Sequence, residues 1–129
     1  MPWSHAPGGG FSPAGVRPWL PLTAAARRNV ADQVEDPDSV LSFTRRAIAR
    51  RSGNEDLALG SYSSLDSPED TWVFQRGRGT VVALNLSDAA REISGLHGSI
   101  TLATDRAREG HRVDGAVTMA PWSGLVVET

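Results

Sequence analysis

The segment TWVFQRGRGTVVALNLSD, residues 71–88, decides the fold class of this chain. It contains two runs rich in β-branched and aromatic residues, separated by the short stretch Gly77-Arg78-Gly79. Such runs favour extended strands, and a short connection with glycine favours an antiparallel hairpin. We therefore predict a β-hairpin here, in which Trp72 and Phe74 alternate along one strand as core or half-core residues.

Further short runs with β propensity follow this hairpin, and Gly, Asp and Ser separate them. Their spacing is typical of a small antiparallel sandwich, and Pro121 is expected at an edge, a bulge or a corner between two strands. The runs are REISG (91–95), SITLATD (99–105), AVTMAPW (116–122) and GLVVET (124–129). The sequence therefore predicts a mainly β domain over residues 55–129.

The segment before this domain, NVADQVEDPDSVLSFTRRAIARRSGN (29–54), predicts a helix over roughly 37–52. Asp36 is the expected N-cap, and Pro37 fits the first helical position, where its missing N–H costs nothing. Ser52-Gly53-Asn54 is the expected end. A shorter helical or turn-like piece is expected around 29–34. The apolar face of the main helix consists of Val40, Leu41, Phe43, Ala47 and Ile48, and arginines gather toward its C-terminus.

The first 28 residues have neither of these periodicities. Five prolines and several glycines exclude a continuous helix or a central strand, so we predict a long irregular loop. Unlike a disordered tail, this loop carries large apolar side chains: Trp3, Phe11, Trp19 and Leu20. Their flat rings could stack on sugars or other ligands, or they could anchor the loop to a scaffold, and both readings stay open.

Composition excludes several classes of function. The 129 residues have a net charge of −2, and the thirteen basic residues are all arginines scattered along the chain, which argues against a nucleic-acid partner. No apolar run approaches the ~20 residues of a membrane span, and no signal-peptide pattern stands at the start, so no membrane partner is expected. The absence of cysteine fits a reducing compartment, and a cytoplasmic location is expected.

The search for catalytic chemistry finds no constellation. The acidic residues are expected to be caps near Asp36, turn residues in SLDSPED (64–70), or solvated groups at Glu55 and Asp56. His5, His97 and His111 are isolated, so no metal site is predicted, and we expect the last two to be exposed in turns. Gly8-Gly9-Gly10 lacks the strand, helix and lysine of a phosphate loop, and no cofactor is expected.

Taken together, these segments resemble the C-terminal end of the α-glucosidases and oligo-1,6-glucosidases of glycoside hydrolase family thirteen, in the amylase superfamily. MPW and GFSPAGVRPWLPL (10–22) resemble the stretch after the eighth barrel strand, and the segment over 29–51 resembles the last barrel helix with its cap. ALGSYSSLD, VVALNLSD, ITLATD and APWSGLVVE resemble the β-sandwich called domain C, of the maltogenic-amylase C-terminal type.

The resemblance implies a division of the chain. Residues 1–54 would be the remnant of a catalytic (β/α)8 barrel, namely a long loop and one amphipathic helix, and residues 55–129 the C-terminal β-sandwich. The family's catalytic Asp, Glu and Asp lie on earlier barrel strands, so no catalytic residue is assigned in this chain. The loop borders the substrate cleft in relatives, so the resemblance implies that Trp3 and Phe11 are cleft residues. Ser4-His5 replaces the acidic pair often found after that Trp.

Three functions follow as expectations. The first is the C-terminal fragment of an α-glucosidase-like hydrolase, which would bind α-glucosidic oligosaccharides through its parent enzyme. Met1 coincides with an internal methionine of the family motif, as expected of a truncated reading frame. The second is a free-standing carbohydrate-binding β-module with Trp3, Phe11, Trp19 or Trp72 as a stacking platform. The third is a piece that docks on a separately encoded barrel.

Overall fold

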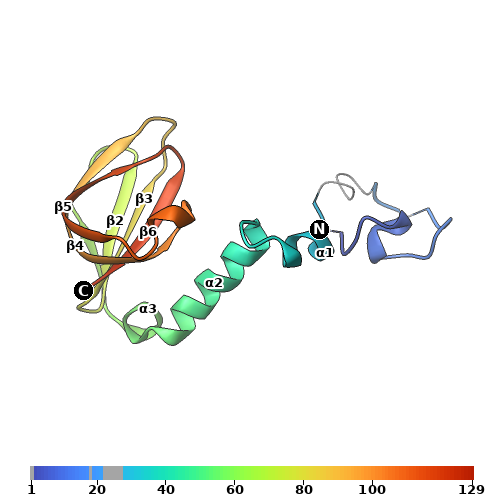
Figure 1. Ribbon diagram of the computed structural model, residues 1–129, viewed down its shortest axis with the longest axis horizontal. Coiled ribbons are helices and arrows are strands. Elements are labelled where there is room, and N and C mark those ends of the chain that lie inside the picture. Colours follow the sequence, from blue (N-terminus) through green and yellow to red (C-terminus); the bar gives the residue numbers. More distant parts are fainter. Residues whose placement is uncertain (1, 18, 22–27) are drawn as a thin grey trace. The chain divides into compact units, whose positions relative to one another are not determined.

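The computed structural model describes residues 2–17, 19–21 and 28–129 (Figure 1). The chain separates into two compact units, Met1–Arg45 and Arg46–Thr129, which are described one at a time. Helix α2 (Val40–Gly53) crosses from the first unit into the second. The two units meet between residues 45 and 46, and the domain boundary predicted between residues 54 and 55 lies C-terminal to that point.

The first unit is a long loop followed by helices. The described part of the loop contains a single 3-10 turn, η1 (Pro7–Gly10), and helix α1 (Val30–Glu35) follows where a short helical piece was expected. Asn29 caps α1, because its side-chain oxygen accepts a hydrogen bond from the N–H of Asp32. The loop character predicted for the first 28 residues holds for those that the structure describes.

The predicted start of the main helix is wrong by three residues. Helix α2 begins at Val40, and Ser39 is its cap: the Ser39 hydroxyl accepts a hydrogen bond from the N–H of Ser42 at 3.1 Å. Asp36 instead accepts from the N–H of Asp38 and forms a turn before the helix. Asp36 and Ser39 are both residue types that favour the N-cap position. Ser39 is the cap because its hydroxyl lies three residues before a helical N–H that needs an acceptor.

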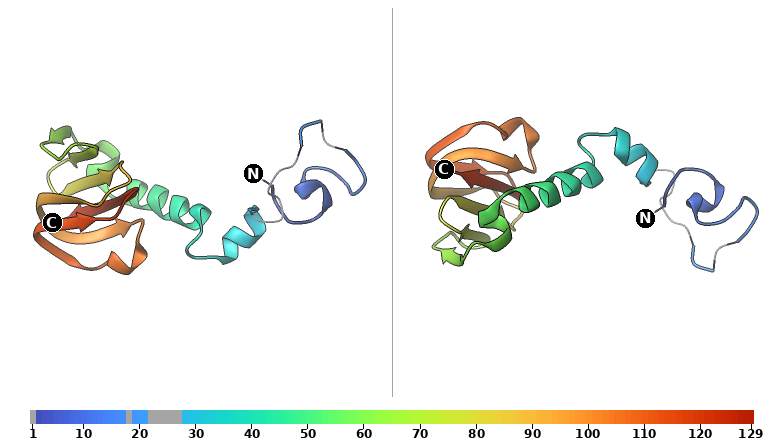
Figure 2. Two further views of the ribbon diagram at one scale, coloured as in Figure 1. Left: turned by 90° about the horizontal axis from the view of Figure 1, so that it is seen from above. Right: turned by 90° about the horizontal axis from the view of Figure 1, so that it is seen from below.

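The second unit is mainly β, as predicted. It begins with the end of α2 and a short helix, and six strands form one antiparallel sheet in the order β1-β2-β3-β6-β4-β5 (Figures 1 and 2). Its further elements are α3 (Glu55–Leu59), β1 (Tyr62–Leu65), β2 (Thr71–Arg76), β3 (Thr80–Asn85), β4 (Arg91–Ala103), η2 (Arg106–Arg108), β5 (Arg112–Met119) and β6 (Ser123–Glu128). The hairpin predicted over 71–88 is the pair β2 and β3, and Pro121 lies in the corner between β5 and β6.

Two runs that the sequence separates form one strand. REISG and all but the last two residues of SITLATD are part of β4, which contains Gly95 and Gly98 at positive φ and shifts register twice against its partners. At Gly98 a side chain would overlap the backbone carbonyl of Glu128 in the neighbouring strand. Glycine therefore allows two backbones to approach closely here and does not end the strand.

The core lies on the inner face of the sheet. One cluster of buried side chains includes Val73 of β2 together with Val113 and Val117 of β5, although three strands separate β2 from β5 in the sheet. The sheet must therefore curve until its two ends face each other, which gives the layered packing expected of a sandwich. The other members are Ala83, Ile93, Leu96, Ile100, Ala103, Met119, Leu125 and Val127.

Ion pairs join the C-terminal half of α2 to the sheet. The guanidinium of Arg50 forms a bidentate pair with the carboxylate of Glu128 on β6, and Asn54 donates to the same carboxylate at 2.9 Å. One turn earlier, Arg46 donates to both oxygens of Glu109, at 2.9 and 2.7 Å. These are charge-assisted, partly buried contacts, and they explain why the second unit begins inside the helix.

Helix α3 is also held by polar contacts, which corrects the expectation that Asp56 is solvated. Its carboxylate accepts a hydrogen bond from the N–H of Gly79 at 2.8 Å, in the turn of the β2–β3 hairpin. At Gly77 a side chain would overlap this carboxylate. The predicted turn glycines thus have a second role, because they leave room for an acidic side chain from α3.

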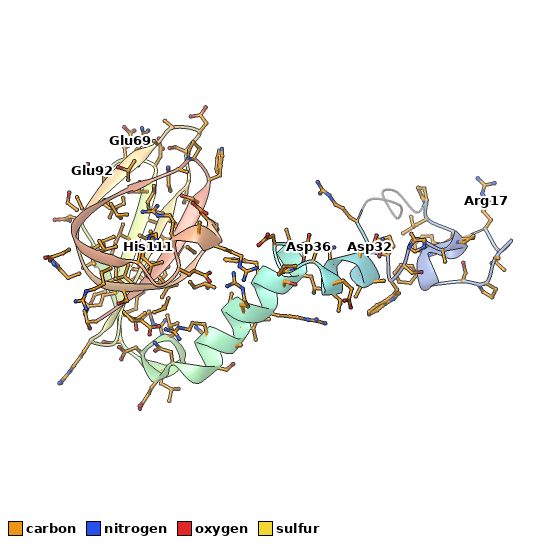
Figure 3. The ribbon with its side chains drawn as sticks, viewed as in Figure 1. Arg17, Asp32, Asp36, Glu69, Glu92 and His111 are labelled. Atoms are coloured by element: carbon orange, nitrogen blue, oxygen red, sulfur yellow. The ribbon has the colours of Figure 1, made fainter. Side chains whose placement is uncertain are left out.

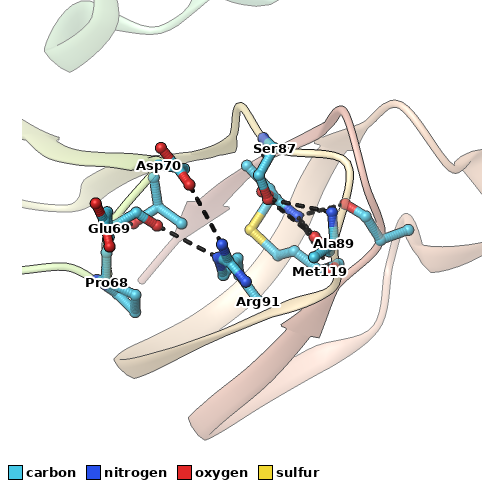
Figure 4. A network of polar contacts seen from close by, with 10 residues as sticks. Pro68, Glu69, Asp70, Ser87, Ala89, Arg91 and Met119 are labelled. Carbon is cyan, nitrogen blue, oxygen red and sulfur yellow. Dashed lines mark hydrogen bonds and ion pairs between the residues drawn. The ribbon is translucent and has the colours of Figure 1, made fainter.

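Polar contacts also order the loops at the other end of the sheet (Figure 4). Asn85 is buried and its side chain donates to the carbonyls of Ala89 and Ala120, while the Ser87 hydroxyl donates to Asn85. Beside them, Arg91 reaches the carboxylate of Asp70 at 3.3 Å. The buried amide therefore connects the β3–β4 loop to the β5–β6 corner.

Removing the Arg50 side chain should destabilise the second unit. Arg50→Ala leaves the partly buried Glu128 carboxylate without its bidentate partner, and we expect a loss of about 1 to 3 kcal/mol in the free energy of unfolding. Urea denaturation followed by circular dichroism measures this loss. Arg45→Ala, an exposed arginine on the same helix, is the matched control and should change the midpoint little. Equal effects of both variants would contradict the role given to Arg50.

Stability should also fall in acid through Glu109. Burial raises the pKa of this carboxyl, but hydrogen bonds from Arg46 and the Ala103 N–H, together with the charges of Arg46 and Arg106, outweigh burial and lower the pKa below its ordinary 4.5. A lowered pKa stabilises the fold above the unfolded-state pKa, and this contribution disappears as pH falls through the folded-state value.

The Glu109→Gln variant tests this linkage. Its stability should be lower than that of the wild type at pH 7, and the difference should shrink as pH falls below about 4.5. Glu92→Gln, an exposed strand residue, is the control. Unfolding curves measured between pH 7 and pH 3 give the comparison, and a difference that stays constant across this range would contradict the linkage.

Candidate functional site

The candidate site is the loop that carries Trp3. Backbone hydrogen bonds close this loop into a turn. The N–H of Trp3 donates to the carbonyl of Gly9 at 2.8 Å, and the loop returns across the 3-10 turn η1. The carbonyls of Pro2 and Trp3 then accept hydrogen bonds from Val30 and Ala31, at 2.9 and 3.0 Å. The first turn of α1, whose N–H groups lack helical partners, therefore fixes the start of the loop.

A buried amide supports this junction. Asn29 is fully buried, and besides capping α1 it donates from Nδ2 to the carboxylate of Asp32 at 2.6 Å. The other carboxylate oxygen of Asp32 lies 3.8 Å from Nδ1 of His5. Sequence analysis placed Asn29 only near a short helical piece. The signal for its role was the spacing of Asn29 and Asp32, which is that of a cap and the third residue of a helix.

The two expected cleft residues, Trp3 and Phe11, are both exposed. Each leaves 58% of its surface accessible, and among the described residues no ring contact joins them. Trp19 is still more exposed, at 92%. Their exposed faces can meet a ligand, as a stacking platform would, or a scaffold outside this unit, as an anchor would.

Apart from the pair formed by His5 and Asp32, no acidic or histidine side chains of the described residues are seen to gather at this loop. Figure 3 shows Asp32 and Asp36 by the first helix, and Glu69, Glu92 and His111 in the second unit. Within the described ranges, no group of three or more His, Cys, Asp or Glu side chains could hold a metal ion. His97 lies inside β4 and not in a turn, and it is exposed as expected, with Nδ1 2.7 Å from a carboxylate oxygen of Asp114.

The carboxyl with a shifted pKa is not suited to proton donation. Arg46 and the Ala103 N–H hold Glu109 in its ionised form, as described above, whereas a general acid needs a raised pKa. Its position between a helix and a strand end is that of a structural ion pair. Within its described residues, the candidate loop thus offers exposed aromatic rings, and the carboxyl with the shifted pKa is held in its ionised form in the other unit.

Comparison of the sequence with characterised proteins finds α-glucosidases. The chain is 38% identical over 94 residues to a probable α-glucosidase of Rhizobium meliloti, covering 70% of this chain and 17% of that protein. It is 38% identical over 71 residues to the α-glucosidase of Schizosaccharomyces pombe, covering 54% and 12%. A glucan 1,6-α-glucosidase of Streptococcus pneumoniae aligns over 99% of the chain and 24% of its own length at 25% identity. No protein-family model matches.

Comparison of the fold finds trehalulose synthase. The enzyme from Pseudomonas mesoacidophila MX-45 matches 98% of this chain and 24% of its own chain, with a TM-score of 0.86 and 22% identity. An E254Q mutant of that synthase has been solved in complex with its substrate sucrose, with the same coverage. The chain therefore spans no more than about a quarter of the relatives it matches. Separately, no helix within the described residues is long and apolar enough to cross a membrane.

The exposure of Trp3 should depend on Gly10. At Gly10, where φ is +79°, an added Cβ would lie 2.8 Å from the Cβ of Trp3, so we expect Gly10→Ala to displace the tryptophan. Gly15 has a similar φ of +85° and nothing within 4 Å, so Gly15→Ala carries the same backbone strain without the clash. The indole N–H resonance of Trp3, assigned with Trp3→Phe, should move in the first variant and stay in place in the second. Equal displacement in both would contradict the contact.

Proposed function

This chain belongs with the α-glucosidases and oligo-1,6-glucosidases of glycoside hydrolase family thirteen, as a homologue of one part of them, and from this premise we propose that it serves as the C-terminal part of such an enzyme. In this role the loop borders the substrate cleft, α2 completes the barrel, and the β-unit supports barrel stability. The carboxylates that cleave the glycosidic bond belong to the remaining part of the enzyme.

One observation carries this proposal. A solved glycoside-converting enzyme matches 98% of the chain with a TM-score of 0.86, yet the match occupies 24% of that enzyme. The order of elements in this chain, a long loop, a helix and an antiparallel β-unit, is thus reproduced in full inside a larger protein. Residues 1–54 would belong to the barrel and residues 55–129 to the domain that follows it.

The exposure of the first unit supports the same role. Val40 at the start of α2 is 76% exposed, and the sequence gives the helix an apolar face, yet none of its residues is buried. An apolar helical face is stable in water only when another element covers it. Neighbouring helices of a barrel would provide that cover. The exposed Trp3 and Phe11 would then stand at the end of the barrel where the substrate binds.

The proposed substrate class is an α-glucosidic oligosaccharide, bound through the enzyme as a whole. The relatives carry the names α-glucosidase and oligo-1,6-glucosidase, and the matched synthase has sucrose as its substrate. Trp3 and Phe11 would contact a sugar ring by stacking, without taking part in bond cleavage. Neither cofactor nor metal is needed for that contact.

The 129-residue chain by itself should not hydrolyse maltose, isomaltose or a nitrophenyl α-glucoside faster than buffer does, because the pair of catalytic carboxylates lies outside it. Release of glucose or nitrophenol from the purified chain measures this. Hydrolysis that persists in the purified chain and disappears on mutation of one of its own carboxylates would overturn the proposal.

A complementation experiment tests whether the chain can serve as the C-terminal part of an α-glucosidase. The Rhizobium meliloti relative, produced without the segment that aligns with this chain, should gain hydrolytic activity when the chain is added, and the relative's own segment is the positive control. With Trp3→Ala the restored enzyme should show a KM raised severalfold at similar kcat, while Trp122→Ala, exposed in the other unit, should leave KM unchanged. Rescue by the control segment without rescue by this chain would contradict the supporting role.

A further inference from the structure

A row of aromatic rings on the second unit is separate from the candidate loop. Tyr62 and Phe74 have ring centroids 5.5 Å apart, and Trp72 and Phe74 are 4.9 Å apart. The indole N–H of Trp72 donates to the Tyr62 hydroxyl at 3.2 Å, so a hydrogen bond joins the two rings that contact Phe74. We call Tyr62, Phe74 and Trp72 the aromatic stripe.

Strand register places the stripe on the outer face of the sheet, at its edge. Val73, between Trp72 and Phe74, is buried in the core, so its two neighbours point the opposite way. β1 is an edge strand, and only β2 pairs with it. Trp72 is 46% and Tyr62 52% exposed, while Phe74 between them is half-buried. The outer rings are therefore accessible and held in fixed orientations.

Hydrogen-bonding groups alternate with the rings. Ser64 pairs with Phe74, and Arg76 pairs with Tyr62, so both polar side chains lie on the same face as the stripe. Ser64 is exposed, and the Tyr62 hydroxyl, which accepts from Trp72, keeps its own proton for donation. The surface thus combines flat apolar rings with donors and acceptors at their rims.

This combination fits a sugar. The faces of aromatic rings carry partial negative charge, and the C–H groups on one face of a pyranose carry partial positive charge, so the two stack. The hydroxyls at the edge of the sugar ring then meet the polar groups beside the stripe. The contacts of Phe74 with both outer rings hold Trp72 and Tyr62 in place for such stacking.

We propose that the aromatic stripe is a binding surface for α-linked gluco-oligosaccharides, additional to the substrate cleft. The choice of α-linked sugars rests on the function proposed above, whereas the stacking surface does not. Only about half of Trp72 and of Tyr62 is exposed, so the stripe offers less than the ~800 Å² that each partner buries in a stable protein interface. A short oligosaccharide needs no larger area.

Nuclear magnetic resonance titration of the complete 129-residue chain tests the proposal. Maltotriose and isomaltotriose are added to millimolar concentration, and the acyclic polyol sorbitol is the control ligand. The Trp72 indole N–H and the backbone N–H groups of Ser64 and Phe74 should shift with the trisaccharides and not with sorbitol, while the Trp122 indole stays unchanged. Absence of shifts, or equal shifts with sorbitol, would overturn the proposal.

Two variants separate sugar stacking from general apolar contact. Trp72→Phe keeps a flat ring and should retain most of the affinity, whereas Trp72→Leu keeps apolar volume without a ring and should weaken binding about tenfold or more, which corresponds to ~1.4 kcal/mol. Unshifted core resonances show that each variant is folded. Equal affinities of the two variants would overturn the assignment. Shifts of the Trp72 resonance that depend on protein concentration in the absence of sugar would also overturn it, because they indicate contact between copies of the chain.

The outcomes are independent of those for the proposed function. Sugar binding at the stripe is read from resonances of the second unit and requires no hydrolysis. If the titration fails and complementation succeeds, the aromatic stripe is not a sugar-binding surface, and the role proposed in an α-glucosidase is unaffected. Binding at the stripe without complementation would support the second site and count against the supporting role in an α-glucosidase.

Discussion

The carboxylate of Glu128 is the point on which the second unit depends. It accepts hydrogen bonds from Arg50 on α2, from Asn54 between the helices, and from Thr101 on β4. Asn54 also caps α3 and donates to Thr80 on β3. A side chain on the last strand thus joins two helices to two neighbouring strands, and a partly buried charge without these donors would be costly.

This arrangement shows why the C-terminal half of α2 groups with the sheet, whereas the sequence predicts a boundary after the helix. The sequence pattern of a helix shows which of its faces is apolar, but it does not show which other element covers that face. From the sequence alone, this helix is therefore expected to belong to a part of the structure other than the sheet. Arg46 and Arg50 lie on the side that meets acidic partners 63 and 78 residues later in the chain. Such distant pairs leave no local pattern in the sequence.

Predictions succeeded where the deciding interactions are local. The hairpin over 71–88 and the helical piece near 30–35 follow from neighbouring residues, and both were predicted from the sequence. The β4 strand was divided in two because Gly95 and Gly98 look like breaks, whereas Gly98 in fact allows the close approach of Glu128. In the candidate site, sequence analysis named the rings Trp3 and Phe11, but the buried Asn29 that organises their loop was not singled out.

The two surfaces with exposed rings differ in how they are built, and this difference bears on what they can bind. Trp3 stands on a loop whose start is held by two backbone hydrogen bonds to α1, and among the described residues no ring contact supports its side chain. Trp72 stands on a paired strand, and Tyr62 holds its indole. A preorganised ring loses little freedom when a weak ligand stacks on it, so it can contribute to affinity without a closed pocket. Under the proposed function, a sugar contact at Trp3 would therefore depend on the rest of the enzyme, whereas one at Trp72 would depend on this unit alone.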